Sequence, residues 1–393
     1  MREFMKKFIK NLNLALGLGA LSAGLILSGC DTDNTEKPKP LVPFTQAINI
    51  KQTLNRSPTD GSDRAFLSFG PVIDQDNLLT DDRKGHVASI DAISGRSNWS
   101  VNLHQDLSST LGVFGGHVYV GSLNGLLLAL NESTGQLLWQ AQLPSSLLAA
   151  PVGNADLVIV HTHDGSLTAF NVQKGSQVWQ VLGSTPNLTM EGDSSPVMDP
   201  DNHAVILASD NGDLTSYNLS NGQVNWDRPI AIPAGGTDVS QMVDIIGTPV
   251  LEQGVIYAAT YHGNIVAVNA IDGTLIWEHP ISSLKAVALS GHAVITTNDQ
   301  GHVMAFDRDT GRELWTQDAF EARFTTGPAV LNNQYVIVGD YAGYVHWLSL
   351  SNGQQIGQVK MGSHVINADP VISGNQVYLT DTDGRVVAYK IGA

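Results

Sequence analysis

The chain has 393 residues, of which 37 are acidic and 21 are basic, so its formal net charge is −16 at pH 7. Only 15% of the residues are charged, whereas 39 are glycine and one is cysteine. The acidic charge makes nucleic acid and anionic lipid poor partners, because both repel a negative surface. A single cysteine excludes an intramolecular disulfide, and many glycines with few charges favour short strands joined by tight turns.

Residues 1–29 have the pattern of a secretory signal peptide. Basic residues precede an apolar stretch from Leu14 to Leu27, which is short for a membrane span. Small residues then lead into Cys30, and this junction resembles the bacterial lipoprotein cleavage site. That resemblance implies cleavage before Cys30 and lipid attachment to its thiol. An ordinary signal peptide with an incidental cysteine is the alternative.

Residues 30–43 are polar and contain prolines, and we expect them to form a lipidated flexible tether. A lipid on Cys30 would hold the following domain at a membrane surface without crossing the membrane. Without residues 1–29 the chain has 17 basic and 36 acidic residues, a net charge of −19. Asp31 resembles the inner-membrane retention signal of enteric bacteria. We expect the outer membrane, and retention at the inner membrane stays open.

A Gly-x-x-x-Trp pattern recurs six times and contains six of the seven tryptophans. Successive tryptophans lie 40, 40, 47, 51 and 38 residues apart, which is the length of a four-stranded propeller blade. In a seventh copy, Gly357 stands where the tryptophan would be. We expect each tryptophan to pack against the neighbouring blade, where it can bury a large apolar area. The six copies are Gly95–Trp99, Gly135–Trp139, Gly175–Trp179, Gly222–Trp226, Gly273–Trp277 and Gly311–Trp315.

Each repeat also contains a hairpin signal between two apolar runs, such as Asn124-Gly125, where a two-residue turn would need positive φ at both positions. Eight such hairpins occur, against seven outer strands. The alternating segment Phe44–Leu54 can supply the eighth outer strand, which would remove the open edge of the last blade. The sequence therefore predicts an all-β fold: an eight-bladed β-propeller of four-stranded antiparallel blades over residues 44–393, closed by an N-terminal strand in the last blade.

Two intervals between tryptophans are longer than the others, from Trp179 to Trp226 and from Trp226 to Trp277. Much of their surplus lies in residues 183–195 and 229–247, between one outer strand and the next inner strand. Insertions in repeat proteins collect in loops, and loops on a rigid scaffold carry binding. We expect the two insertions to lie side by side and form one surface. A tolerated insertion without a role is the alternative.

The sequence contains no pattern typical of a catalytic or metal centre. His161 and His163 alternate beside a turn, but no third ligand follows at a telling spacing, so we interpret them as turn residues. Signature motifs of hydrolases, zinc proteases and phosphate-binding loops do not occur. We therefore expect no catalytic residues, no metal and no cofactor.

The repeated outer strand resembles the blades of pyrroloquinoline-quinone-dependent dehydrogenases, which share Thr-Gly-x-x-x-Trp. That resemblance implies a vicinal cysteine pair and a calcium-binding acidic cluster, but Cys30 is the only cysteine. A quinoprotein-like propeller with an enzymatic or ligand-binding function at the periplasmic face of the inner membrane is the alternative function.

The lipoprotein signal, the tether and the eight repeats together resemble the BamB family, the propeller lipoproteins of the outer-membrane β-barrel assembly machine. The resemblance covers essentially the whole chain, and its specific stretches are Gly339–Gly353 and Val243–Tyr257. It implies a non-enzymatic scaffold at the periplasmic face of the outer membrane. The implied partners are the POTRA domains of the barrel subunit BamA and the rest of its complex, and the propeller itself is expected to be monomeric.

The resemblance also places the family's two binding loops on this chain. Residues 187–192 match a Leu-x-Leu-Arg-Gly element, and residues 244–246 match an Asp-x-Asp element before Thr-Pro. Glu191 replaces the arginine and Ile246 replaces the second aspartate, so the charge pattern is altered. Apolar side chains in a polar loop suit the centre of an interface, and Asp244 is expected to add charge complementarity. The implied BamA-binding residues are Leu188, Thr189, Met190, Glu191, Asp244 and Ile246.

Overall fold

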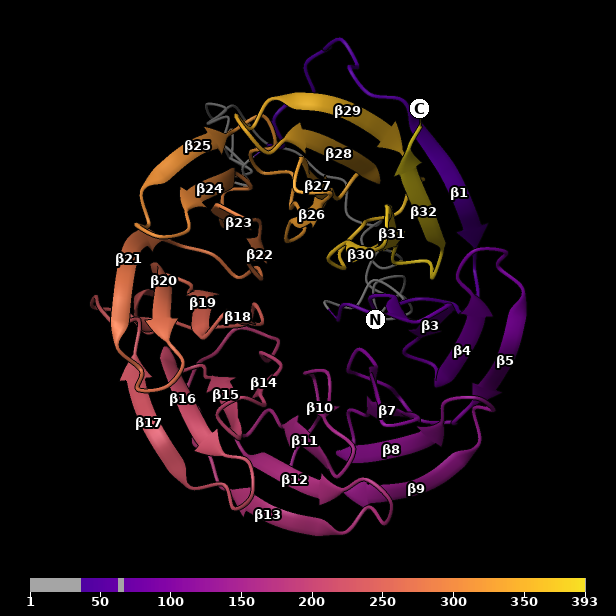
Figure 1. The fold of residues 1–393 in the computed structure, drawn as a ribbon, viewed down its shortest axis with the longest axis vertical. Helices are drawn as coiled ribbons and strands as arrows, with labels where there is room; N and C mark the ends of the chain where they lie inside the picture. The colour runs from indigo at the N-terminus through magenta and orange to yellow at the C-terminus, as the bar shows by residue number, and fades with distance from the viewer. Residues whose placement is uncertain (1–36, 63–66, 393) are drawn as a thin grey trace, which may run out of the picture. The chain divides into compact units, whose positions relative to one another are not determined.

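Nearly all regular structure is β-strand in the computed structural model, which describes residues 37–62 and 67–392. In this part of the chain, 32 strands form eight separate four-stranded antiparallel sheets, arranged as the blades of a ring (Figure 1). The predicted all-β, eight-bladed propeller is confirmed. Innermost strand first, the blades are β2 (Val72–Asp74), β3 (Asn77–Asp81), β4 (His86–Asp91), β5 (Ser97–Asn102); β6 (Gly112–Phe114), β7 (His117–Gly121), β8 (Leu126–Asn131), β9 (Leu137–Gln142); β10 (Val152–Gly153), β11 (Leu157–His161), β12 (Leu167–Asn171), β13 (Gln177–Val181); β14 (Val197–Asp199), β15 (Ala204–Ala208), β16 (Asp213–Asn218), β17 (Val224–Pro229); β18 (Val250–Glu252), β19 (Val255–Ala259), β20 (Gly263–Asn269), β21 (Leu275–Ile281); β22 (Ala288–Leu289), β23 (Ala293–Thr297), β24 (Val303–Asp307), β25 (Glu313–Gln317); β26 (Ala329–Leu331), β27 (Tyr335–Gly339), β28 (Tyr344–Ser349), β29 (Gln355–Lys360); and β30 (Val371–Ser373), β31 (Gln376–Thr380), β32 (Val386–Ile391), β1 (Ile50–Arg56).

The antiparallel order gives the ring two different faces. In each blade, the hairpin between the second and third strands and the connection to the next blade leave the sheet at the same end. We call this side the loop face. The hairpins between the first and second strands lie on the opposite face, as do those between the third and fourth strands in every blade but the last, where β32 and β1 are not joined. The core lies between blades, where Leu79 and Val87 of the first blade pack with Val118 and Leu128 of the second.

The hairpins on the loop face are longer than two residues. In the second blade, Gly125 has φ 72°, but Asn124 does not have positive φ. The turn closes through the N–H of Gly125, which donates to the Ser122 carbonyl (3.1 Å), and the N–H of Leu126, which donates to the Ser122 hydroxyl (3.0 Å). The expectation of positive φ at both positions is therefore wrong, because a side chain stabilises a wider turn that needs only the glycine.

Each tryptophan of the repeat joins its blade to the next blade. The indole N–H of Trp99 donates to the carbonyl of Glu132 (2.7 Å), and the ring lies on Gly135, where an added Cβ would be 2.4 Å from it. Gly135 has φ 72°, so the position needs glycine for its backbone and for its space. The other five tryptophans make the same bond at 2.7–2.9 Å. These six contacts confirm the expected packing, and we call each one a seam.

Strand β1 closes the ring as the outermost strand of the last blade. It pairs antiparallel with β32 from Ile50 opposite Ile391 to Arg56 opposite Val386. The predicted closure is thus confirmed, although the strand lies later than the expected segment Phe44–Leu54. The reason is that the preceding residues follow the seventh blade instead, where the N–H of Ala47 donates to the Ile356 carbonyl (2.8 Å).

The seam between the seventh blade and β1 has its large and small residues exchanged. Gly357 occupies the tryptophan position, and Ile50 occupies the glycine position of the next motif. The side chains of Ile50 and Ile48 fill the space over Gly357, where an added Cβ would lie 2.7–2.8 Å from them. Leu54 takes the place of the tryptophan in the following seam. The missing seventh tryptophan is therefore replaced by isoleucines from the N-terminal segment.

Candidate protein-binding surface

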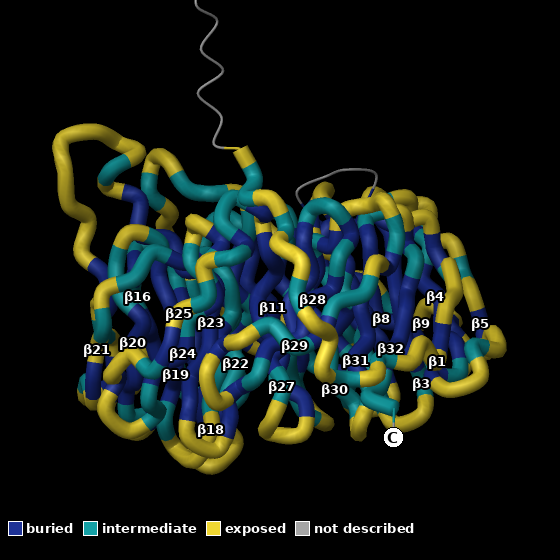
Figure 2. The backbone as a smooth tube through the Cα atoms, turned by 90° about the horizontal axis from the view of Figure 1, so that it is seen from above, coloured by how far each residue is buried: buried dark blue, intermediate teal, exposed yellow. Residues whose placement is uncertain are grey.

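The two long connections predicted to bind a partner both lie on the loop face, in neighbouring blades. One joins β13 to β14 over residues 182–196, and the other joins β17 to β18 over residues 230–249. The second contains the 3₁₀ helix η1 (Val239–Gln241) and an unbroken run of exposed residues, Ile232–Val239, which rises above the rest of this face (Figure 2). We call these two connections the paired loops.

Direct contacts hold the paired loops together. The backbone N–H of Met190 donates to the carboxylate of Asp244 (2.9 Å). Gly192 lies against Ile246, whose Cγ2 would be 3.1 Å from a Cβ added at Gly192. The two segments singled out from the sequence are thereby brought into one continuous surface, although 54 residues separate Met190 from Asp244.

The predicted residues differ in how far they reach solvent. Leu188 is 43% exposed and Glu191 is also exposed, whereas Thr189, Met190 and Ile246 are half-buried. Leu188 and Glu191 therefore form the outer part of this surface. Met190 and Ile246 lie where the two loops meet.

Sequence reasoning missed three further apolar side chains on the paired loops. They lie in segments rich in glycine, proline and threonine, and this composition is the signal that could have identified them, since no strand pattern there would bury them. Each of them adds exposed apolar area to the loops on which Leu188 lies. The three residues are Leu182 and Ile232, both more than 75% exposed, and Val239.

Asp244 supports the surface from below. Its side chain is 1% exposed, so it does not present a charge to a partner. The expectation that Asp244 adds charge complementarity to the interface therefore disagrees with its burial. Burial raises the pKa of Asp244, and the N–H of Met190 opposes that effect by hydrogen bonding to the carboxylate. Its position in the structure is that of an internal acceptor that fixes the loop containing Leu188.

Two more buried carboxylates, Asp193 and Asp210, belong to the same region. Burial, followed by the charges of Asp193 and Asp244, raises the pKa of Asp210 to about 7. His163 contacts Asp193 through Nδ1 (3.1 Å), and this hydrogen bond raises the pKa of His163. His161 is buried against the Ser194 carbonyl (3.1 Å), and burial lowers its pKa. The histidine pair thus supports the first of the paired loops, and each side chain has its own protein partner.

The paired loops border the mouth of the central channel. The cavity there has a volume of about 1310 Å³. Met190, Glu191 and Ile246 form one part of its wall, and the exposed apolar side chains of Phe324 and Val365, from two other connections, form another part. The surface available to a partner therefore extends from the paired loops across the mouth of the channel.

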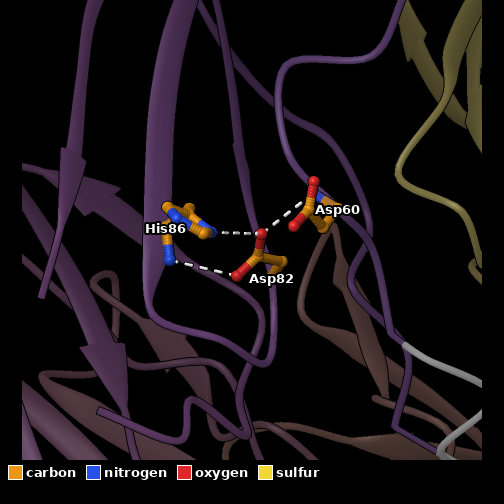
Figure 3. A group of neighbouring side chains, drawn as sticks. All are labelled: Asp60, Asp82 and His86. Carbon is orange, nitrogen blue, oxygen red and sulfur yellow. Dashed lines mark hydrogen bonds and ion pairs between the residues drawn. The ribbon is translucent and has the colours of Figure 1, made fainter. Parts of the chain in front are cut away.

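A separate group on the loop face has metal-ligand residue types. Asp60, Asp82 and His86 bring their ligand atoms within 4.8 Å of one another (Figure 3). Asp82 already accepts the N–H groups of Lys84 (2.8 Å) and His86 (3.0 Å) on one oxygen, and contacts the Asp60 N–H (2.9 Å) and His86 Nδ1 (2.8 Å) with the other. Asp340 binds the N–H groups two and four residues later in the same way. We therefore interpret the group as a repeated turn.

Cys30 and the signal peptide lie outside the described residues. Within residues 37–62 and 67–392, no helix is long and apolar enough to cross a membrane.

Comparisons with known proteins place this geometry in a family. The family model for the outer membrane protein assembly factor BamB matches residues 83–317 and 299–392. A BamB of Burkholderia pseudomallei is 31% identical over 378 residues, covering 96% of this chain and 98% of the relative. The crystal structure of BamB from Moraxella catarrhalis superposes with a TM-score of 0.79 at 26% identity, covering 87% of this chain and all of that one.

Quinoproteins share the architecture at a greater distance. The quinohemoprotein alcohol dehydrogenase of Comamonas testosteroni superposes with a TM-score of 0.66 at 12% identity, covering 87% of this chain and 76% of that enzyme. This likeness shows a common fold and nothing of the chemistry. The family-model match and the near full-length similarity at 31% identity decide the relationship: the chain belongs to the family of the outer membrane protein assembly factor BamB.

Proposed function

We propose that the protein is a non-enzymatic scaffold lipoprotein that assists the folding and insertion of outer-membrane proteins. Its paired loops would bind the POTRA domains of BamA, and a lipid on Cys30 would hold it at the periplasmic face of the outer membrane. The observation that carries the choice of surface is the exposure of Leu188 on a loop that the blades and Asp244 hold in place. A large apolar side chain presented on a rigid support is typical of the centre of an interface.

The first experiment titrates POTRA domains against the variant with Leu188→Ala and Met190→Ala. We expect at least about tenfold weaker binding, or roughly 1.4 kcal/mol, because the apolar contact is removed. The melting temperature should stay close to that of the unaltered protein, since Leu188 is exposed and Met190 only half-buried. Matched controls are Ile93→Ala and Ile271→Ala, which remove exposed apolar side chains from the opposite face. Unchanged affinity in the double variant, or an equal loss in the controls, would remove the paired loops from the interface.

Asp244 gives a second, more selective test. Asp244→Ala removes the acceptor of the Met190 N–H, whereas Asp244→Asn keeps an oxygen at that place. We expect the alanine variant to bind more weakly and the asparagine variant to keep most of the affinity. Equal losses in both variants would show that the charge of Asp244, and not its support of the loop, matters for binding.

Glu191 tests the altered charge pattern. It is exposed and negative where the family element implies a positive residue, so we propose that the facing surface of this chain's partner is positive. Glu191→Arg should weaken binding, and the loss should shrink as salt is added, because exposed charges are screened. A loss that does not depend on salt would contradict this assignment.

A further inference from the structure

The first described residues are bound to the loop face. The N–H of Lys39 donates to the Glu321 carbonyl (3.0 Å), and its ammonium group contacts the Asp318 carboxylate (3.1 Å). Leu41 packs on the apolar core of the sixth and seventh blades. We call residues 38–41 the strap. It lies inside the segment expected to be a free tether, and it binds the connection between β25 and β26.

A network of buried charged side chains lies beneath the strap and forms a hydrogen bond to it. Arg323 is 5% exposed, and it donates through Nε (2.8 Å) and Nη2 (2.6 Å) to Asp340, which is inaccessible to solvent. Its remaining nitrogen, Nη1, donates to the carbonyl of Lys39 (3.2 Å). Burial raises the pKa of Asp340, but the hydrogen bonds from His346, Arg323 and a backbone N–H outweigh burial and lower it. Arg323 is therefore held in one orientation, with one donor directed at the strap.

The rest of the network keeps Arg323 from turning away. His346 is fully buried and contacts the same oxygen of Asp340 (3.2 Å), and the ring of Tyr341 lies 5.3 Å from the guanidinium carbon. Burying an arginine and a carboxylate costs free energy of desolvation, and this cost is offset only when the hydrogen bonds of both groups are satisfied. The Lys39 carbonyl satisfies one of them. Arg323, Asp340 and His346 therefore form a defined binding site for the strap, which we call the seat. A contact between mobile surface side chains would not fix the position of the strap in this way.

The seat determines where the lipid-bearing end of the chain leaves the ring. The connection between β25 and β26 belongs to the loop face, as do the paired loops (Figure 2). Nine residues lead from Cys30 to Lys39, so their reach is at most about 30 Å. We propose that the strap turns the loop face, with the paired loops, toward the membrane that holds the Cys30 lipid. The proposal rests on the proposed lipid anchor.

The net charge of the chain opposes close contact with anionic lipid. Without residues 1–29 the chain has a net charge of −19, and where the strap leaves the ring two carboxylates, Asp318 and Glu321, share the single ammonium group of Lys39. Anionic lipid repels such a surface. The partner of the paired loops would therefore enter a gap bounded by the length of residues 31–39, so the partner segment must itself lie close to the membrane.

The orientation is measured by energy transfer on vesicles. Acylation consumes the single native cysteine, so one introduced cysteine can be labelled selectively with a donor dye. Ile232→Cys places the dye on the loop face and Ile271→Cys places it on the opposite face, and both side chains are more than two-thirds exposed. Acylated protein is bound to vesicles of phosphatidylethanolamine and phosphatidylglycerol that carry an acceptor on the headgroup. A six-residue strand separates the faces by about 20 Å, so the Ile232→Cys donor should transfer more energy.

Release of the strap supplies the matched comparison. Lys39→Ala with Leu41→Ala removes the ion pair and the apolar contact, and Arg323→Lys removes the planar fork that holds Asp340 and the Lys39 carbonyl together, so the triple variant weakens every contact of the strap except the Lys39 N–H bond. In that background, the difference in transfer between the two dye positions should become smaller. If protein with the unaltered strap floats with the vesicles but both donors transfer equally, or the Ile271→Cys donor transfers more, the proposed orientation is wrong. The lipid anchor is not affected by that result. Failure of the acylated chain to float would overturn the lipid anchor, and the orientation with it.

Discussion

Replacing Gly273 by alanine should destabilise the propeller more than the same replacement at Gly254. Both glycines lie in hairpins of the fifth blade on the opposite face, and their φ angles are +69° and +76°. Both alanines therefore adopt left-handed backbone, which costs about 1–2 kcal/mol. Gly254 has nothing within 4 Å of an added Cβ, so this cost is the whole effect there.

At Gly273 the new methyl group also meets an indole. The Cβ would be 2.7 Å from Cε3 of Trp226, and the ring cannot move away without losing the bond from its N–H to the Ala270 carbonyl (2.9 Å). Overpacking of this kind costs about 1–3 kcal/mol. We therefore expect a total loss of about 2–5 kcal/mol for Gly273→Ala, against about 1–2 kcal/mol for Gly254→Ala.

The assay is guanidinium unfolding followed by far-ultraviolet circular dichroism. A double-mutant cycle adds Trp226→Leu, alone and with Gly273→Ala, because the smaller side chain leaves room for the methyl group. In the leucine background the cost of Gly273→Ala should fall to that of Gly254→Ala. Equal costs for the two single alanine variants, or an unchanged cost in the leucine background, would refute the packing argument for the seams.

Four further predictions concern other parts of the chain. Asp210→Asn should stabilise the protein at pH 8 by up to about 4 kcal/mol and have no effect at pH 4. The reason is that the folded-state pKa of Asp210 is about 7, so the folded state favours the protonated carboxyl, and the unaltered protein loses that contribution to its stability as the pH rises through 7. A stabilisation by Asp210→Asn that is the same at pH 4 and at pH 8 would contradict this. Gly357→Trp should lower the melting temperature, although it restores the repeat, because Ile50 occupies the space; an unchanged value would show that the isoleucine moves aside. Deletion of residues 44–56 should expose the edge of the last blade and produce oligomers in size-exclusion chromatography, whereas a monomer of unchanged stability would contradict closure by β1. Cys30→Ser should fold normally but incorporate no labelled fatty acid, and label in the variant would place the lipid elsewhere.

The number of blades could be predicted from the sequence because each blade repeats a local pattern. The tryptophan spacing gives the length of a blade, and the surplus hairpin indicates that the first strand completes the last blade. The boundaries of β1 could not be predicted, because alternation continues through residues 47–54 and does not define a register. The register depends on Ile50 filling the space over Gly357, a contact between residues more than 300 positions apart.

In the candidate site, too, features that follow from a local pattern could be predicted, and features that depend on contacts between distant residues could not. Leu188 was identifiable because an apolar residue in a polar loop has no strand partner. The burial of Asp244 could not be predicted, because it depends on the N–H of Met190 in another loop. The strap was missed for the same reason. Lys39 and its neighbours have the composition of a free linker, and only the distant Arg323 shows that they bind.

The exchanged pair at the seventh seam has a consequence for the size of the ring. Six seams use one tryptophan–glycine fit, so the outer strand of any of those blades matches the motif of any other. Gly357 would leave a void against a motif that begins with glycine, and Ile50 cannot accommodate an indole. The seventh blade thus has a single complementary neighbour. Shape alone therefore discourages closure of the ring after seven blades, because Gly357 would then face the first blade's Gly95 in place of Ile50.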